Sequence, residues 1–105
     1  MKITNSTIVI TGGSSGLGLE MCRQFIKQGN TVIACSRSIE KLEEAQKILP
    51  DLIVYPCNIA NEQECEAFVK WIETSYSQVN ILINNAAIIN RTSFIEDDLI
   101  LQKMN

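Results

Sequence analysis

The sequence predicts an α/β fold, a doubly wound parallel sheet with helices on both faces. Two observations predict it. Four short segments are apolar throughout, which is typical of strands buried on both faces. They alternate with segments of about 10 to 15 residues that have apolar positions at helical spacing, as parallel strands joined by right-handed crossovers require.

The first unit is a strand, a glycine-rich stretch and a helix. Residues 7–11 (TIVIT) form the expected strand, and four glycines lie between 12 and 18. Residues 17–28 are expected to be helical, with an apolar stripe at Leu19, Cys22, Phe25 and Ile26. Gly29 and Asn30 end this helix, because a residue free to take positive φ suits a helix C-terminus.

The second unit repeats the pattern. Residues 31–35 (TVIAC) form the second expected strand, and Ser38 can cap a helix that Pro50 stops. This helix turns three apolar residues inward, at Leu42, Ala45 and Leu49. Residues 52–55 (LIVY) form the third strand.

The third unit begins with a helix over 61–75. Asn61 and Glu64 resemble a capping box at its start. Its apolar face is expected at Cys65, Phe68, Val69 and Ile72. A fourth strand follows at 81–83 (ILI), then a polar loop over 84–91 and a further helix from about residue 93, with Glu96 completing a second box-like start.

Composition limits the classes of function. The 105 residues are 46% hydrophobic and 20% charged with a net charge of −3, which suits one globular domain. The absence of a basic patch argues against nucleic-acid binding, and no long apolar segment indicates membrane insertion. The amino-terminal residues enter a strand without a secretory signal pattern, so we expect a cytoplasmic protein.

The spacing of the cysteines and the missing histidine argue against a metal site and against histidine-dependent catalysis. Cys22, Cys35, Cys57 and Cys65 form no CxxC pair, and the chain contains no histidine. No metal site is therefore expected, and buried reduced thiols are the better interpretation of the cysteines. Catalysis by Ser-His or Cys-His pairs is excluded within this sequence.

The glycine-rich stretch lies where a phosphate site would be. It follows the first strand and opens the first helix, so free N–H groups and the positive helix end would face an anion. The alternative is that the glycines only relieve a crowded turn. A Walker-type loop is excluded because no Gly-Lys-Ser/Thr follows.

Two motifs resemble the short-chain dehydrogenase/reductase family. TGGSSGLG, at 11–18, is similar to the family's T-G-x-x-x-G-x-G loop, and NNAA, at 84–87, stands where the family has N-N-A-G. The resemblance runs from about residue 5 to at least residue 90. It implies that 1–105 form a single, partial NAD(P)-binding domain, Rossmann-like and incomplete, with about four strands in the order 3-2-1-4.

The same resemblance implies the cofactor-binding residues. The residues that would line the pyrophosphate and the adjacent ribose are Gly12, Ser14, Ser15, Gly16, Leu17 and Gly18. Asn85, Ala86 and Ala87 would flank the cofactor, while Asn84 ties the central strands together. Ala87 replaces a family glycine, and its methyl group is harmless only if φ is negative there.

The end of the second strand predicts which dinucleotide binds. A carboxylate there would accept hydrogen bonds from the ribose of NAD, but this chain has Ser36 and Arg37. A guanidinium binds phosphate through two parallel hydrogen bonds, so NADP(H) is favoured and NAD(H) is the alternative. Asn58, with Ile59 beside it, replaces an aspartate that the family uses near the adenine amino group. Its other interpretation is a turn residue.

The catalytic residues that the resemblance implies are missing. The family uses a tyrosine as acid/base, a lysine four residues later and a serine. Tyr55 is followed four positions later by Ile59, and Tyr76 by Asn80, so neither begins a Tyr-x-x-x-Lys. Both tyrosines are interpreted as structural. Asn105 could match an asparagine of the family's proton relay, although its offset is a few residues short.

We therefore expect the N-terminal part of an NADP(H)-dependent enzyme that transfers hydride between nicotinamide and a carbonyl or alcohol. The chain alone is expected to be inactive, and its end within a helical pattern favours a fragment. The alternative is a non-catalytic dinucleotide-binding or interaction module. A third candidate is another Rossmann-like enzyme, such as a methyltransferase. An uncovered edge at the fourth strand predicts a homo-oligomer.

Overall fold

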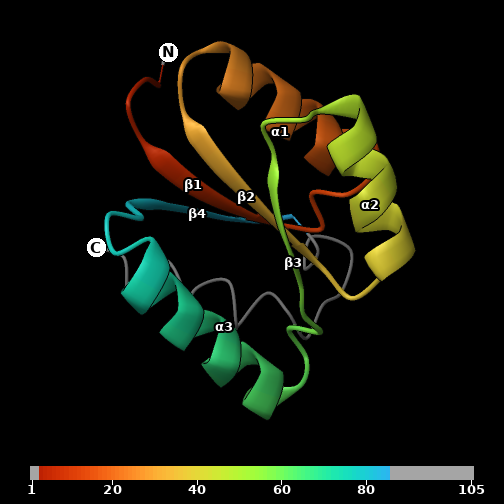
Figure 1. Ribbon diagram of the computed structural model, residues 1–105, viewed down its shortest axis with the longest axis vertical. Coiled ribbons are helices and arrows are strands. Elements are labelled where there is room, and N and C mark those ends of the chain that lie inside the picture. Colours follow the sequence, from red (N-terminus) through yellow and green to blue (C-terminus); the bar gives the residue numbers. More distant parts are fainter. Residues whose placement is uncertain (1–2, 86–105) are drawn as a thin grey trace.

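The computed structural model describes residues 3–85 and confirms the predicted α/β fold. The parallel sheet has the order β3-β2-β1-β4, as expected. Helices α1 and α2 lie on one face of the sheet and α3 lies on the other (Figure 1). The elements are β1 (Thr7–Thr11), α1 (Gly16–Lys27), β2 (Thr31–Ser36), α2 (Ile39–Ile48), β3 (Ile53–Pro56), α3 (Glu62–Ser75) and β4 (Ile81–Asn84).

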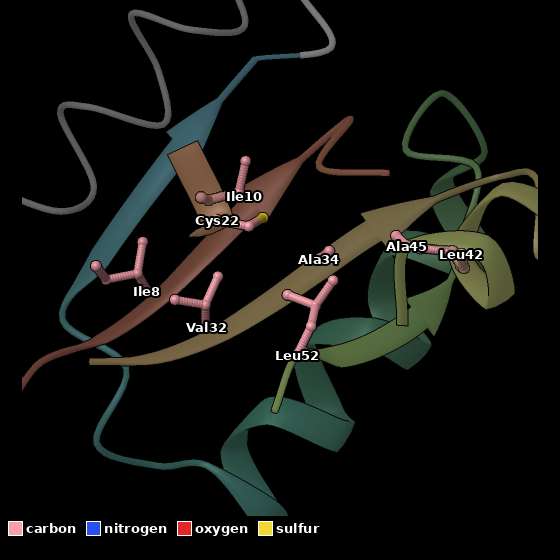
Figure 2. Close-up of a cluster of buried hydrophobic side chains, with 8 residues drawn as sticks. All are labelled: Ile8, Ile10, Cys22, Val32, Ala34, Leu42, Ala45 and Leu52. Atoms are coloured by element: carbon pink, nitrogen blue, oxygen red, sulfur yellow. The ribbon is translucent and has the colours of Figure 1, made fainter. Parts of the chain in front are cut away.

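The core consists of two apolar layers, one on each face of the sheet. Successive side chains of a strand point to opposite faces, so Ile8 and Ile10 face α1 and α2 while Val9 faces α3. The first layer is drawn in Figure 2 and contains Ile8, Ile10, Cys22, Val32, Ala34, Leu42, Ala45 and Leu52. The second contains Val9, Ile33, Cys35, Cys57 and Phe68.

Burial on both faces, expected for all four strands, holds for the two central ones. All of β1 is buried, as are the four central residues of β2. The outer strands β3 and β4 contain no fully buried residue. Each of them has only one neighbouring strand within the described sheet, which leaves part of its surface uncovered.

The structure confirms the two predicted N-caps, Ser38 and Asn61. The predicted capping box between Asn61 and Glu64 is wrong. The Ser38 hydroxyl accepts from Lys41 N at 3.3 Å, and Asn61 Oδ1 accepts from Glu64 N at 3.0 Å. The carboxylate of Glu64 does not return to Asn61, as a capping box requires. It accepts instead from the backbone N–H of Asn58 at 3.1 Å.

One residue of the expected apolar face of α3 points away from the sheet. Val69 is 48% exposed, whereas its neighbour Phe68 is 5% exposed. Consecutive helical residues are about 100° apart, so both cannot face the same layer. Within residues 3–85 no helix is long and apolar enough to cross a membrane.

A buried asparagine secures the amino-terminal ends of the strands. Asn30 is 8% exposed, and its Oδ1 accepts from Ser6 N at 3.0 Å. Its Nδ2 donates to the carbonyl oxygens of Ile3 at 2.7 Å and Phe25 at 2.9 Å. These bonds hold the segments at the amino-terminal ends of β1 and β2 together. The candidate site residues lie at the opposite, carboxyl ends of the strands.

Candidate functional site

The candidate site lies at the carboxyl ends of the parallel strands, where β1 passes into the glycine-rich loop. Gly12 has φ of 70° and donates its N–H to the carbonyl oxygen of Cys35 at 2.8 Å. Gly16 has φ of 56°, and a side chain there would meet nothing within 4 Å. The hydrogen bond from Gly12 N to Cys35 O thus holds the loop against β2. The space beside Gly16 is open.

Gly18 brings α1 closer to the loop than any side chain permits. A methyl group at this position would lie 2.2 Å from the carbonyl oxygen of Gly12 and 2.9 Å from Nδ2 of Asn85. Asn85 Nδ2 also donates to that same carbonyl at 3.3 Å. Glycine is therefore required at 18, and Asn85 joins the end of β4 to the loop.

The start of α1 is open toward an anion. Ser15 is the N-cap, but its side chain makes no capping bond, and the first turn contains no acidic residue. In contrast, side chains cap α2 and α3, and both have acids in their first turns. Within residues 3–85, no acceptor is provided for the N–H groups of Gly16, Leu17 and Gly18. Free N–H groups at the positive end of a helix dipole suit a phosphate group.

The loop rests on a buried thiol that the sequence did not mark as part of the site. Cys22 is fully buried, and its Sγ donates to the carbonyl oxygen of Gly13 at 3.6 Å. A methyl group on Gly13 would lie 3.0 Å from this sulfur. Burial raises the pKa of the Cys22 thiol to about 12, so it remains protonated and packs as a small apolar group.

The central strands are joined beside the loop by two polar side chains. The Thr11 hydroxyl donates to Asn84 Oδ1 at 2.8 Å, and the two residues are directly paired between β1 and β4. The family resemblance implies this role for Asn84 but names no partner for it. Thr11, the first residue of TGGSSGLG, was the feature of the sequence that could have indicated this partner.

The carboxyl end of β2 presents a hydroxyl and a cation. The Ser36 hydroxyl accepts from Ser38 N at 3.2 Å. Arg37 is exposed and forms neither an ion pair nor a side-chain hydrogen bond with any residue from 3 to 85. Its guanidinium is available for a ligand, and no acidic residue lies between 31 and 39.

The segment after β3 is a tight turn centred on Asn58. Its Oδ1 accepts from Ala60 N at 3.0 Å, and its carbonyl oxygen accepts from Asn61 N at 2.9 Å. Cys57 N donates to the carbonyl oxygen of Ser36 at 2.9 Å, which holds this turn against the end of β2. The turn role that the sequence suggested for Asn58 is thus present in the structure. Ile59 packs partly buried against the layer under α3.

A family model described as short chain dehydrogenase matches residues 6–103. The chain belongs to the short-chain dehydrogenase family. An uncharacterized oxidoreductase of Bacillus subtilis, DltE, is 42% identical over 94 residues, which cover 90% of this chain and 37% of the relative. Farnesol dehydrogenase of Aedes aegypti is 30% identical over 86% of this chain and 39% of its own length.

Solved structures of the short-chain dehydrogenase family share the fold. L-sorbose reductase from Gluconobacter frateurii, complexed with NADPH and L-sorbose, matches with a TM-score of 0.73 and 30% identity. That match covers 81% of this chain and 34% of the reductase. A short chain dehydrogenase from Bacillus anthracis matches with a TM-score of 0.70 and 32% identity, over 76% of this chain and 34% of its own. The chain thus spans little more than a third of the relatives it matches.

The two tyrosines of this short-chain dehydrogenase chain lie in an aromatic cluster. The ring centroid of Tyr55 is 4.8 Å from that of Phe68 and 4.7 Å from that of Trp71. Tyr76, at the end of α3, is 5.1 Å from Trp71. Their packing agrees with the structural role expected for both.

Cys35 and Cys57, in the second core layer, are free and buried, as expected. Burial raises the pKa of Cys35 and of Cys57, and Cys35 Sγ donates to the carbonyl oxygen of Cys57 at 3.6 Å. Within residues 3–85, no group of three or more candidate ligands could hold a metal ion. The site residues Ala86, Ala87 and Asn105 lie outside the described part of the chain.

Proposed function

We propose that residues 1–105 form the cofactor-binding N-terminal part of an NADP(H)-dependent short-chain dehydrogenase. The whole protein would transfer hydride between nicotinamide and a carbonyl or alcohol substrate. The observation that carries the proposal is the open start of α1, which lacks a side-chain cap and an acidic residue. It lies in a chain that the family model matches nearly throughout.

The described residues fit a dinucleotide. The pyrophosphate would lie at the N–H groups of Gly16, Leu17 and Gly18, where Gly16 leaves the approach open. Ser14 and Ser15 would complete this part of the site. Gly12, held by Cys35, and Asn85, held on the Gly12 carbonyl, would keep the loop in the binding geometry.

Arg37 would select the phosphorylated dinucleotide. Its exposed guanidinium, which has no partner within residues 3–85, can bind the 2′-phosphate, and the Ser36 hydroxyl can donate beside it. The sorbose reductase that shares this fold is complexed with NADPH, which is consistent with the choice. NAD(H) is the alternative ligand.

The bound nicotinamide would supply or accept the hydride. The residues of this chain would bind and orient the cofactor, while proton transfer needs a tyrosine and a lysine that the sequence does not provide at the family's spacing. We therefore propose that the 105-residue chain binds NADPH without turnover. The substrate would be bound by a longer form of the protein, in the cytoplasm.

Calorimetric titration of the chain with NADPH and NADH tests this assignment. We expect NADPH to bind more tightly, and Arg37→Ala to weaken NADPH by about 10- to 100-fold, because hydrogen bonds to charged groups are worth about 1.5–3 kcal/mol. NADH affinity should change little. Lys70→Ala, which removes an exposed cation from α3, is the matched control. Tighter binding of NADH would overturn the role of Arg37.

A non-catalytic dinucleotide-binding or interaction module is the second candidate, supported by the missing Tyr-x-x-x-Lys. Sequencing the codons that adjoin this segment separates the two. A downstream Tyr-x-x-x-Lys, together with NADPH-dependent reduction of carbonyl compounds, supports the enzyme. A stop codon directly after Asn105 supports the module.

A further inference from the structure

Cys22 lies behind the glycine-rich loop, one helical turn after Gly18 and on the same face of α1. Its side chain is fully buried in the apolar layer drawn in Figure 2. Gly18 packs against the carbonyl group of Gly12, and Cys22 packs against Gly13. Two consecutive residues of the loop therefore rest on one stripe of the helix.

The Cys22 thiol fixes the orientation of the peptide group between Gly13 and Ser14. Its Sγ donates to the Gly13 carbonyl oxygen at 3.6 Å. Burial raises the pKa of this thiol to about 12, so the proton that the bond requires stays in place. A methyl group on Gly13 would lie 3.0 Å from the sulfur and 3.0 Å from Cβ of Ala34, so this part of the loop lies tightly against the buried layer.

The other end of the same peptide group is a donor without an acceptor. No peptide bond within residues 3–85 is cis, and the N–H of a trans peptide points away from its carbonyl oxygen. Since the Gly13 carbonyl is directed at Cys22, the Ser14 N–H is directed away from the buried layer. Ser14 is only 8% exposed, and neither its N–H nor its hydroxyl group has a hydrogen-bond partner among residues 3–85. Polar groups this deeply buried are normally paired, which favours a ligand as the partner.

On the basis of the proposed function, we propose that Cys22 is a positioning residue that turns the Ser14 N–H toward the pyrophosphate of the dinucleotide. This N–H adds one donor to those at the open start of α1. Cys22 itself does not touch the ligand, because its thiol is fully buried behind Gly13. A thiol suits this position, since it is apolar enough for the core and still donates a weak hydrogen bond.

The test compares NADPH with adenosine 2′-monophosphate, which lacks the pyrophosphate, in titrations of the chain followed by nuclear magnetic resonance of the backbone amides. The quantity measured is the ratio of the two dissociation constants, adenosine 2′-monophosphate over NADPH. Cys22→Ala removes the donor. Val32→Ala is the matched control, because it loosens the same buried layer near the amino-terminal end of β2.

We expect the ratio to fall by roughly 3- to 10-fold in Cys22→Ala, as the loss of one hydrogen bond to the ligand predicts. The affinity for adenosine 2′-monophosphate should stay the same, and Val32→Ala should leave the ratio unchanged. A merely structural role of the thiol would lower stability without changing the ratio. An unchanged ratio in Cys22→Ala therefore overturns the inference, and so does an equal fall in Val32→Ala.

A second measurement uses the wild-type chain alone. NADPH should shift the amide proton signal of Ser14 downfield, as a new hydrogen bond to a phosphate does, and adenosine 2′-monophosphate should not. A Ser14 signal that stays in place when NADPH is bound overturns the inference, even if Cys22→Ala does not fold. If NADPH fails to bind the wild-type chain, the proposed function itself fails. If NADPH binds but the ratio is constant, only the role of Cys22 fails.

Discussion

Substitution of Gly18 by alanine tests how closely the loop and α1 are packed. The added methyl group would lie 2.2 Å from the Gly12 carbonyl oxygen and 2.9 Å from Asn85 Nδ2. Both obstacles are fixed: Gly12 is bonded to Cys35 O at 2.8 Å, and Asn85 is bonded to Gly12 O at 3.3 Å. The backbone must therefore move before the methyl group fits.

The magnitude follows from two opposing effects. Forcing an extra methyl group into a packed site costs typically about 1–3 kcal/mol, and a backbone obstacle places this case at or above the upper end. Alanine regains about 1 kcal/mol over glycine in a helix. We expect a net loss of about 2–3 kcal/mol in the free energy of unfolding, which corresponds to a fall in Tm of roughly 10–20 °C for a domain of this size.

Urea denaturation followed by Trp71 fluorescence measures this loss, with thermal unfolding by circular dichroism as the second readout. Gly29→Ala is the matched control, because Gly29 has φ of 93° but open space around the position of a methyl group. That substitution should cost only about 1–2 kcal/mol, from backbone strain alone. If Gly18→Ala is as stable as the wild type, or more stable than Gly29→Ala, the close-packing argument is refuted.

Three further predictions concern the rest of the described structure. Asn30→Ala should lower the free energy of unfolding by about 2–3 kcal/mol in urea denaturation, because it leaves buried backbone groups without partners; a loss below about 0.5 kcal/mol would contradict this. Alkylation at pH 8, followed by mass spectrometry, should modify half-buried Cys65 before Cys22 and Cys35, whose pKa values burial raises; equal labelling would contradict it. Sedimentation at tens of micromolar should show self-association through the edge of Ile81–Asn84, which a stable monomer would disprove.

The order of the elements was predictable because it depends on long-range patterns in the sequence. Uninterrupted apolar runs such as 7–11 and 31–35 have few alternatives to a buried strand, and the structure confirms them as β1 and β2. Ser38 and Asn61 were also predictable as caps, since each needs only its own side chain and a nearby N–H group.

Side-chain partners were harder to predict where several acceptors or faces compete. Glu64 has the spacing of a capping box with Asn61, but the turn brings Asn58 N to its carboxylate first. Val69 is apolar and adjacent to the inward-facing Phe68, and only the helix rotation decides which of them is buried. Cys22 fitted the apolar stripe of α1, and nothing in its spacing indicated that it supports Gly13 from behind.

Within residues 3–85, the helices differ in how the N–H groups of their first turns are satisfied. Asn61 and Ser38 satisfy N–H groups of α3 and α2 internally, so those starts contribute to stability without a ligand. The start of α1 forgoes a cap worth about 1 kcal/mol, although Ser15 is a residue type that caps well. The N–H groups left free there can be satisfied by a phosphate, and binding at 100 times Kd would stabilise the folded chain by about 2.7 kcal/mol. The local deficit at α1 is therefore smaller than the stabilisation that a bound dinucleotide would provide, as expected of a site that completes the fold when occupied.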